Sequence, residues 1–142
     1  MIEGLKDKVA IVTGGGHGIG RAYCLGFGGA GAKVVVADID EPAAVKVAKE
    51  VNTQTDAKSL AVKVDVSNEA STQMMVQTIL DQFSRIDILV NNAAIFATIP
   101  MNRGGIDTID PVEWDRMMAV NLKGLFFCSR AVLPTMRRHI SG

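Results

Sequence analysis

A glycine-rich turn, Thr13-Gly14-Gly15-Gly16-His17-Gly18-Ile19-Gly20, most constrains this chain. It follows the apolar run 9–12, which is typical of a buried strand, and leads into a helical pattern. The first amides of a helix have no intrahelical partner and lie at the positive end of its dipole, so they attract phosphate. Gly14 permits the tight turn, Gly18 lets a pyrophosphate approach the backbone, and Gly20 lets helix and strand pack closely. Alone, the turn is a weak signal, because plain tight turns also contain such glycines.

Apolar runs and segments of helical period alternate along the chain, which is the pattern of a parallel sheet with crossover helices. We predict strands at 8–13, 33–39, 59–64 and 86–91, helices at 18–29, 41–52, 68–83 and 111–138, and a long loop at 96–110. Ala22, Leu25, Cys24 and Phe27 are expected to face the core, and Pro134 to bend or interrupt the last helix. The chain then forms one domain over residues 1–142, a partial Rossmann-like, doubly wound parallel α/β sheet of strand order 3-2-1-4.

The switch point of that strand order lies between the first and fourth strands. Ligands of open α/β sheets bind there, at the carboxyl ends of the strands. The glycine turn follows the first strand, and Asn91-Asn92-Ala93-Ala94 follows the fourth. We therefore expect these two distant segments to flank one crevice.

Asp38 ends the second predicted strand and follows Gly20 by 18 residues. This is close to the offset of about 20 residues at which an acidic side chain meets the adenosine ribose. A carboxylate accepts hydrogen bonds from ribose hydroxyls and repels a 2′-phosphate, so Asp38 favours NAD over NADP. The alternative is an aspartate that caps the next helix, ahead of Glu41 and Pro42. His17 supplies a positive charge that does not outweigh this carboxylate.

The composition is that of a globular protein, with 48% hydrophobic residues and a formal net charge of zero. It gives no electrostatic reason to expect nucleic acid or a membrane as a partner, and no apolar run reaches the ~20 residues of a membrane span. Cys24 and Cys128 lack C-x-x-C spacing and are expected to be buried thiols in a reducing compartment, so we predict a cytoplasmic protein. His17 and His139 lack ligand spacing, so no metal site is expected.

Four motifs, in this order, resemble those of the short-chain dehydrogenase/reductase family and cover essentially the whole chain. They are Thr13-Gly14-x-x-x-Gly18-Ile19-Gly20, Asp65-Val66, Asn91-Asn92-Ala93-Ala94 and Asn121. The resemblance implies that Asp65 contacts the adenine amino group, with Val66 beside the ring. It also implies that Asn92 and Ala93 line the cofactor and that Ile19 lies near the pyrophosphate and nicotinamide. Ala94 replaces the glycine usual in the family, and its methyl group is expected to narrow the crevice.

The family's chemistry uses an Asn-Ser-Tyr-Lys tetrad, of which only the first member has a match. The resemblance makes Asn121 the catalytic asparagine, which kinks its helix and holds a water of the proton relay. Tyr23, the only tyrosine, has no lysine four residues later and is expected to pack. We therefore expect a chain truncated before the Ser/Tyr/Lys segment and inactive alone. The complete form is expected to be an NAD-dependent oxidoreductase that moves hydride between a small-molecule alcohol and a ketone or aldehyde.

Two other functions stay open. One is a nucleotide-binding module or pseudo-enzyme without turnover, which continuation of the reading frame into a serine and Tyr-x-x-x-Lys would exclude. The other is an adenosylmethionine-dependent methyltransferase. That class shares a glycine turn and an acidic residue after the second strand, but it does not account for Asn91-Asn92 or Asn121.

The surroundings of the last helix bear on assembly and on substrate. In the family this helix contributes to a dimer interface, so we expect a homo-oligomer. Subunit contacts as well as core residues are expected among Trp114, Met117, Leu125, Phe126 and Val132. The fourth strand would be an unpaired edge, so the isolated chain is expected to aggregate or to form a non-native oligomer.

The loop after the fourth strand carries apolar residues that suggest either an apolar substrate wall or a loop pinned to the core: Ile95, Phe96, Ile99 and Met101. Asp107, Asp110 and Glu113 are expected to form turns and to cap the last helix.

Overall fold

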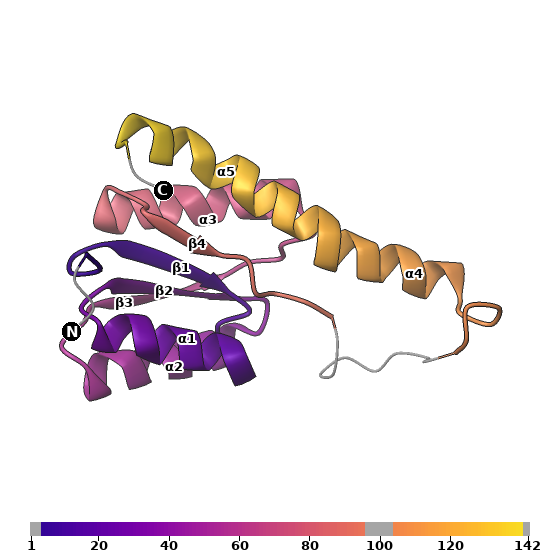
Figure 1. The fold of residues 1–142 in the computed structure, drawn as a ribbon, viewed down its shortest axis with the longest axis horizontal. Coiled ribbons are helices and arrows are strands. Elements are labelled where there is room, and N and C mark those ends of the chain that lie inside the picture. Colours follow the sequence, from indigo (N-terminus) through magenta and orange to yellow (C-terminus); the bar gives the residue numbers. More distant parts are fainter. Residues whose placement is uncertain (1–3, 96–103, 141–142) are drawn as a thin grey trace.

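Strands and helices alternate in the computed structural model, which describes residues 4–95 and 104–140 (Figure 1). The strands are β1 (Val9–Thr13), β2 (Lys33–Asp38), β3 (Ser59–Lys63) and β4 (Ile88–Val90). They pair in parallel in the order β3-β2-β1-β4, which confirms the predicted order 3-2-1-4 and the doubly wound Rossmann-like α/β fold. β4 is shorter than predicted and forms one edge of the sheet.

The helices cover both faces of the sheet. They are α1 (Gly18–Gly29), α2 (Glu41–Gln54), α3 (Glu69–Phe83), α4 (Pro111–Met118) and α5 (Gly124–Arg138), and a π-helical segment, η1 (Ala119–Lys123), joins α4 to α5. Figure 1 shows α1 and α2 on one face, α3 and α5 on the other, and α4 extending beyond the sheet. This single long helix matches the predicted range 111–138.

Pro134 lies inside α5 without ending it, so of the two predicted effects, a bend or an interruption, the interruption is wrong. A proline removes one backbone hydrogen bond and crowds the preceding turn. Here Val132 and Thr135, both 2% exposed, are buried on either side of the proline. Their packing holds the last turns in place.

Side-chain caps explain where three of the helices begin. Asp40 accepts a hydrogen bond from Ala43 N at the start of α2, and Asn68 accepts one from Ser71 N at the start of α3. Asp110 accepts one from Val112 N at the start of α4, as predicted. These bonds satisfy amides that would otherwise lack partners.

The core consists of two layers, because alternate residues of each strand point to opposite faces of the sheet. Val34 and Val36 of β2 pack in the layer toward α1 and α2, whereas Val35 packs in the layer toward α3 and α5. Burial raises the pKa of the Cys24 thiol to about 12 and that of the Cys128 thiol to about 11. Both cysteines are free and buried, as predicted.

The buried face of α1 agrees with the prediction for Cys24, and Leu25 and Phe27 pack against the core partly buried, but the prediction is wrong for Ala22. The buried stripe consists of Gly20, Cys24 and Gly28, spaced by four residues, whereas Ala22 is exposed and Tyr23 is 46% exposed. The glycines let α1 lie close to its neighbours: a Cβ at position 28 would lie 2.8 Å from Val51 Cγ1. This close stripe sets the rotation of the helix, and it turns Ala22 and Tyr23 outward.

Asp87 ties the edge strand β4 to the start of β1. It is 4% exposed and accepts a hydrogen bond of 2.9 Å from Val9 N. Burial by itself would raise the pKa of this carboxyl group, but hydrogen bonds from Arg85 and Val9 and the charges of Arg85 and Lys8 bring it below its usual value. Asp87 is therefore ionised and paired in the folded chain at neutral pH.

Candidate functional site

The glycine turn has the backbone conformation that its sequence predicts. Gly14 and Gly18 have positive φ angles of 65° and 47°, which non-glycine residues rarely adopt. A Cβ at Gly20 would collide with the backbone oxygen of Gly14 and would lie 2.7 Å from Asn92 Nδ2. No side chain of the described residues caps α1, in contrast to the next three helices. Its first amides therefore have no side-chain partner at the helix start.

A hydrogen-bond network joins the end of β1 to the segment after β4. Thr13 Oγ1 accepts hydrogen bonds of 3.1 Å from both Asn92 N and Ala93 N, and it donates one to Val90 O. Asn92 Nδ2 in turn donates to Thr13 O at 3.0 Å and to Gly14 O at 3.2 Å. The two segments expected to flank one crevice are thus bonded to each other.

Asp38, at the end of β2, is held rigidly and is only 7% exposed. Its Oδ2 accepts a hydrogen bond of 2.9 Å from Gly16 N, and its Oδ1 accepts one of 3.0 Å from Asp40 N. The capping alternative is wrong for this residue, because Asp40 caps α2. Asp38 instead connects the glycine turn to the end of β2.

His17 faces Asp40 at the rim of the turn. Its Nε2 lies 3.0 Å from Asp40 Oδ2, and both side chains are about half exposed. The pKa of Asp40 is lowered by the hydrogen bond from Ala43 N and then by that from His17. The imidazole of His17 is therefore held against this carboxylate at the rim of the turn.

Asp65 and Val66 follow β3 in a fixed turn. Asp65 Oδ1 accepts hydrogen bonds from Ser67 N at 2.9 Å and Ser67 Oγ at 2.6 Å. Val66 packs against the start of α5, since a Cβ at Gly124 would lie 2.7 Å from Val66 Cγ2. Gly124 thus lets the long helix approach the segment that follows β3.

Asn121 lies in η1 and clamps the chain that follows β4. Its Oδ1 accepts a hydrogen bond of 2.7 Å from Ile95 N, and its Nδ2 donates one of 3.2 Å to Ile95 O. A π-helical segment is a site at which helices commonly bend, in keeping with the kink expected here. Ile95 is 3% exposed, while Phe96, Ile99 and Met101 lie outside the described residues.

These elements surround an open cavity of about 490 Å³. This is within the usual size range of small-molecule sites. All ten residues predicted to contact a cofactor line it: Gly14, His17, Gly18, Ile19, Gly20, Asp38, Asp65, Val66, Asn92 and Ala93. That they bind a cofactor stays a prediction.

Sequence reasoning assigned no cofactor contact to the other residues that line this cavity, which are Ile39, Val64, Ser67, Ala94, Ile95, Arg116, Ala119 and Val120. Arg116, Ala119 and Val120 have the i, i+3, i+4 spacing of one helix face, directly ahead of Asn121. This helical spacing is the sequence signal that could have placed the three residues together on the wall of the cavity.

Asn121 lines a separate, smaller cavity of about 20 Å³, together with Thr13, Asn91 and Cys128 among others. A cavity of this size has room for one water molecule.

Over residues 4–95 and 104–140, no cluster of three or more His, Cys, Asp or Glu side chains could hold a metal ion. In the same ranges, no helix is long and apolar enough to cross a membrane.

Residues 8–142 match the family model of the short chain dehydrogenases. The chain belongs to the short-chain dehydrogenase family. It is 40% identical over 132 residues to a short chain dehydrogenase/reductase of Aspergillus oryzae, an alignment that covers 93% of this chain and 49% of that protein. It is 39% identical to the galactitol 2-dehydrogenase of Agrobacterium fabrum, over 93% of this chain and 48% of the relative. The chain thus spans about half the length of these curated relatives.

Solved structures of the family have the same fold. A 3-ketoacyl-(acyl-carrier-protein) reductase of Brucella melitensis, complexed with NADH, superposes with a TM-score of 0.85 at 37% identity, covering 95% of this chain and 52% of that one. A metagenomic short-chain oxidoreductase in complex with NADP superposes with a TM-score of 0.87 at 32% identity, covering 97% and 60%. The chain corresponds to the N-terminal half of such enzymes.

Proposed function

We propose that residues 1–142 form one dinucleotide-binding domain, and that its ligand is NAD. The complete protein would then be an oxidoreductase that transfers hydride between a small-molecule alcohol and a ketone or aldehyde. Family membership and the NADH and NADP complexes of its structural neighbours support a nicotinamide dinucleotide as the ligand. The volume of the cavity at the switch point, about 490 Å³, and the presence of the predicted residues in its lining also support such a ligand.

The observation that carries the choice of NAD is the carboxylate of Asp38. It lines the cavity at the end of β2, and backbone amides of Gly16 and Asp40 fix both of its oxygens. A fixed carboxylate can accept hydrogen bonds from the ribose hydroxyls of NAD, whereas it repels the 2′-phosphate of NADP. His17 offers little compensation, because it faces Asp40.

Titration of the 142-residue chain with NADH and NADPH tests this proposal. We expect NADH to bind more tightly by at least about tenfold, which is ~1.4 kcal/mol. Asp38→Ser should remove most of this preference, whereas Asp81→Ser, a control on the exposed side of α3, should retain it. Equal affinity of the unmodified chain for both cofactors would refute the choice of NAD. Tight binding of adenosylmethionine without binding of NADH would refute the dinucleotide.

We assign Asn121 a catalytic positioning role in the complete protein. Its side-chain amide holds the backbone of Ile95, and it lines the small cavity that has room for one water. We further propose that the chain alone binds the cofactor without turnover, because Ser, Tyr and Lys of the tetrad have no counterpart in its sequence. Reduction of a carbonyl compound by NADH in the presence of this chain alone would contradict that statement.

We also propose that the protein forms a homo-oligomer in the cytoplasm. Leu122, Leu125 and Phe126 are each about half exposed and line a shallow groove on the outer side of the long helix. An apolar surface of this kind favours a protein contact. The two free, buried thiols suit a reducing compartment. Light scattering that shows a stable monomer at micromolar concentration would argue against the oligomer.

A further inference from the structure

Arg116 is a cavity residue for which neither the motifs nor the proposed catalysis gives a role. It lies on α4, one helical turn before Ala119 and Val120, and all three line the main cavity. Within the described part of the chain, no carboxylate lies within ion-pair distance of its guanidinium. The other basic residue of the cavity, His17, is occupied by Asp40.

A purely structural role explains Arg116 poorly. A basic residue in the last turn of a helix can stabilise the exposed carbonyl groups there. However, α4 continues through η1 into α5, so the helix does not end at Arg116. The residue is also exposed, so packing does not hold its side chain.

The position of Arg116 along the wall indicates which part of a ligand it would meet. Gly124 packs on Val66, directly after β3. Val120 and Arg116 precede Gly124 by about one and two turns of the same continuous helix. The outer part of this helix, α4, extends beyond the carboxyl ends of the strands (Figure 1). Arg116 is therefore placed on the β3 side of the cavity, with Asp65, Val66 and Ser67, and the glycine turn lies at the end of β1.

We propose that Arg116 forms the outer wall of the adenine end of the cavity, with its guanidinium on the outer face of the adenine ring. This inference rests on the proposed function. Arginine is planar and weakly hydrated, and it stacks on aromatic faces. Val66 would contact the adenine from the inner side. The positive charge also offsets the carboxylates of Asp38 and Asp65, which line the same cavity.

The test compares ligands that carry adenine with one that does not. The 142-residue chain and its Arg116→Ala variant are titrated with NADH and with reduced nicotinamide mononucleotide, both followed by dihydronicotinamide fluorescence. ADP-ribose is then titrated by displacement of NADH. Because stacking of a cation at a partly exposed site is modest in energy, we expect the variant to bind NADH and ADP-ribose two- to fivefold more weakly. Its binding of the mononucleotide should be unchanged.

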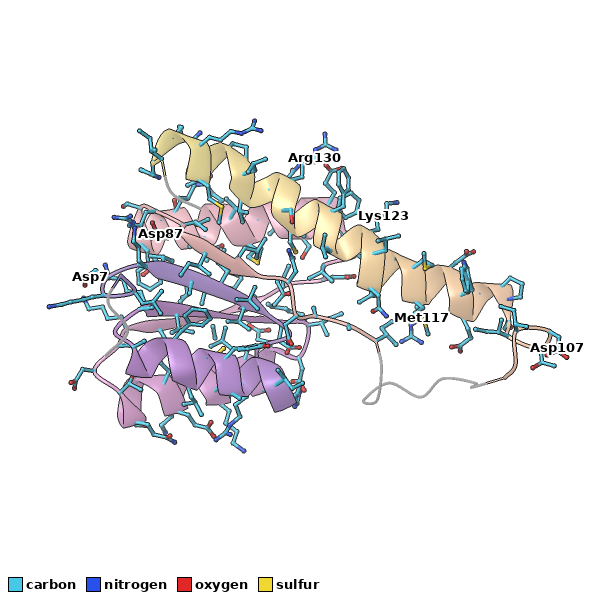
Figure 2. All side chains as sticks on the ribbon, viewed as in Figure 1. Asp7, Asp87, Asp107, Met117, Lys123 and Arg130 are labelled. Carbon is cyan, nitrogen blue, oxygen red and sulfur yellow. The ribbon has the colours of Figure 1, made fainter. Side chains whose placement is uncertain are left out.

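Two further variants separate stacking from charge and from fold. Arg116→Lys retains the charge without the planar group and should recover less than half of the lost affinity. Arg130→Ala is the matched control: Arg130 pairs with Glu69 and projects from the side of α5 away from the sheet (Figure 2). It should leave the binding of all three ligands and the thermal midpoint unchanged.

The outcomes are distinguishable. Unchanged NADH affinity in Arg116→Ala would overturn the inference while the proposed function stands. Equal losses for NADH and the mononucleotide would place Arg116 at the nicotinamide half of the cofactor and would also overturn it. If the unmodified chain binds neither NADH nor ADP-ribose, the proposed function itself fails.

Discussion

Replacing Gly20 by alanine tests whether close packing of the glycine turn shapes the cavity. The new Cβ would collide with the Gly14 oxygen and would lie 2.7 Å from Asn92 Nδ2. Overpacking of this kind costs about 1–3 kcal/mol, and loss of an Asn92 hydrogen bond adds about 1 kcal/mol. The higher helix propensity of alanine stabilises the helix by up to about 1 kcal/mol, which offsets part of this loss. We therefore expect a net loss of about 1–3 kcal/mol in unfolding free energy, and at least tenfold weaker NADH binding.

Gly26→Ala is a matched control in the same helix. A Cβ at Gly26 meets no atom within 4 Å, so the substitution should stabilise the chain by up to about 1 kcal/mol without affecting NADH. Urea unfolding followed by circular dichroism gives both free energies, and fluorescence titration gives both affinities. The reasoning is refuted if Gly20→Ala stabilises the chain as Gly26→Ala does, or if it binds NADH normally.

Three further predictions concern the elements around the cavity. Thr13→Val keeps the side-chain shape but removes the acceptor for Ala93 N, so urea unfolding should show a loss of about 1–3 kcal/mol; a change below ~0.5 kcal/mol would contradict this. Because the pKa of Asp87 is lowered in the folded chain, its stabilising effect is present above about pH 4 and is lost as pH falls through the folded pKa. The unfolding midpoint should therefore drop as the pH falls below about 4, and less steeply in Asp87→Asn. Gly124→Ala would push its Cβ against Val66, so NADH affinity should fall severalfold by the same titration, and unchanged affinity would show that the helix can shift at no cost.

The strand order could be predicted from local pattern, and ten residues that line the cavity could be predicted partly from that pattern and partly from the resemblance of the motifs to those of the family. Each motif comes directly after a strand, and the carboxyl ends of parallel strands lie at one edge of the sheet. Asp38 and Asn92, for example, need only the correct strand assignment to reach the cavity. Motif spacing and fold class therefore agree.

The errors arose where rotation of a helix decides which side chains face inward. Ala22 was expected inside on grounds of apolarity, but the close glycine stripe of Gly20 and Gly28 rotates it outward. Arg116 was missed for a related reason. The i, i+3, i+4 spacing of Arg116, Ala119 and Val120 places them on one face of the helix, but the spacing alone does not say which face of that helix meets the cavity.

The π-helical segment η1 also acts as a phase adjuster between two halves of one helix. In a regular α-helix, residues four apart drift by roughly 40° around the axis, whereas the wider π turn brings them closer to alignment. Val120 can then line the cavity while Gly124 and Cys128, four and eight residues later, face Val66 and the core. A π turn holds one residue more than an α turn, so deleting one residue within 119–123 would leave a regular α-helix of nearly the same phase. Inserting one residue there would instead rotate α4 by roughly 100° relative to α5 and would carry Arg116 off the cavity, with the sheet left intact. The length of this short segment therefore sets which side chains the outer half of the helix presents to a ligand.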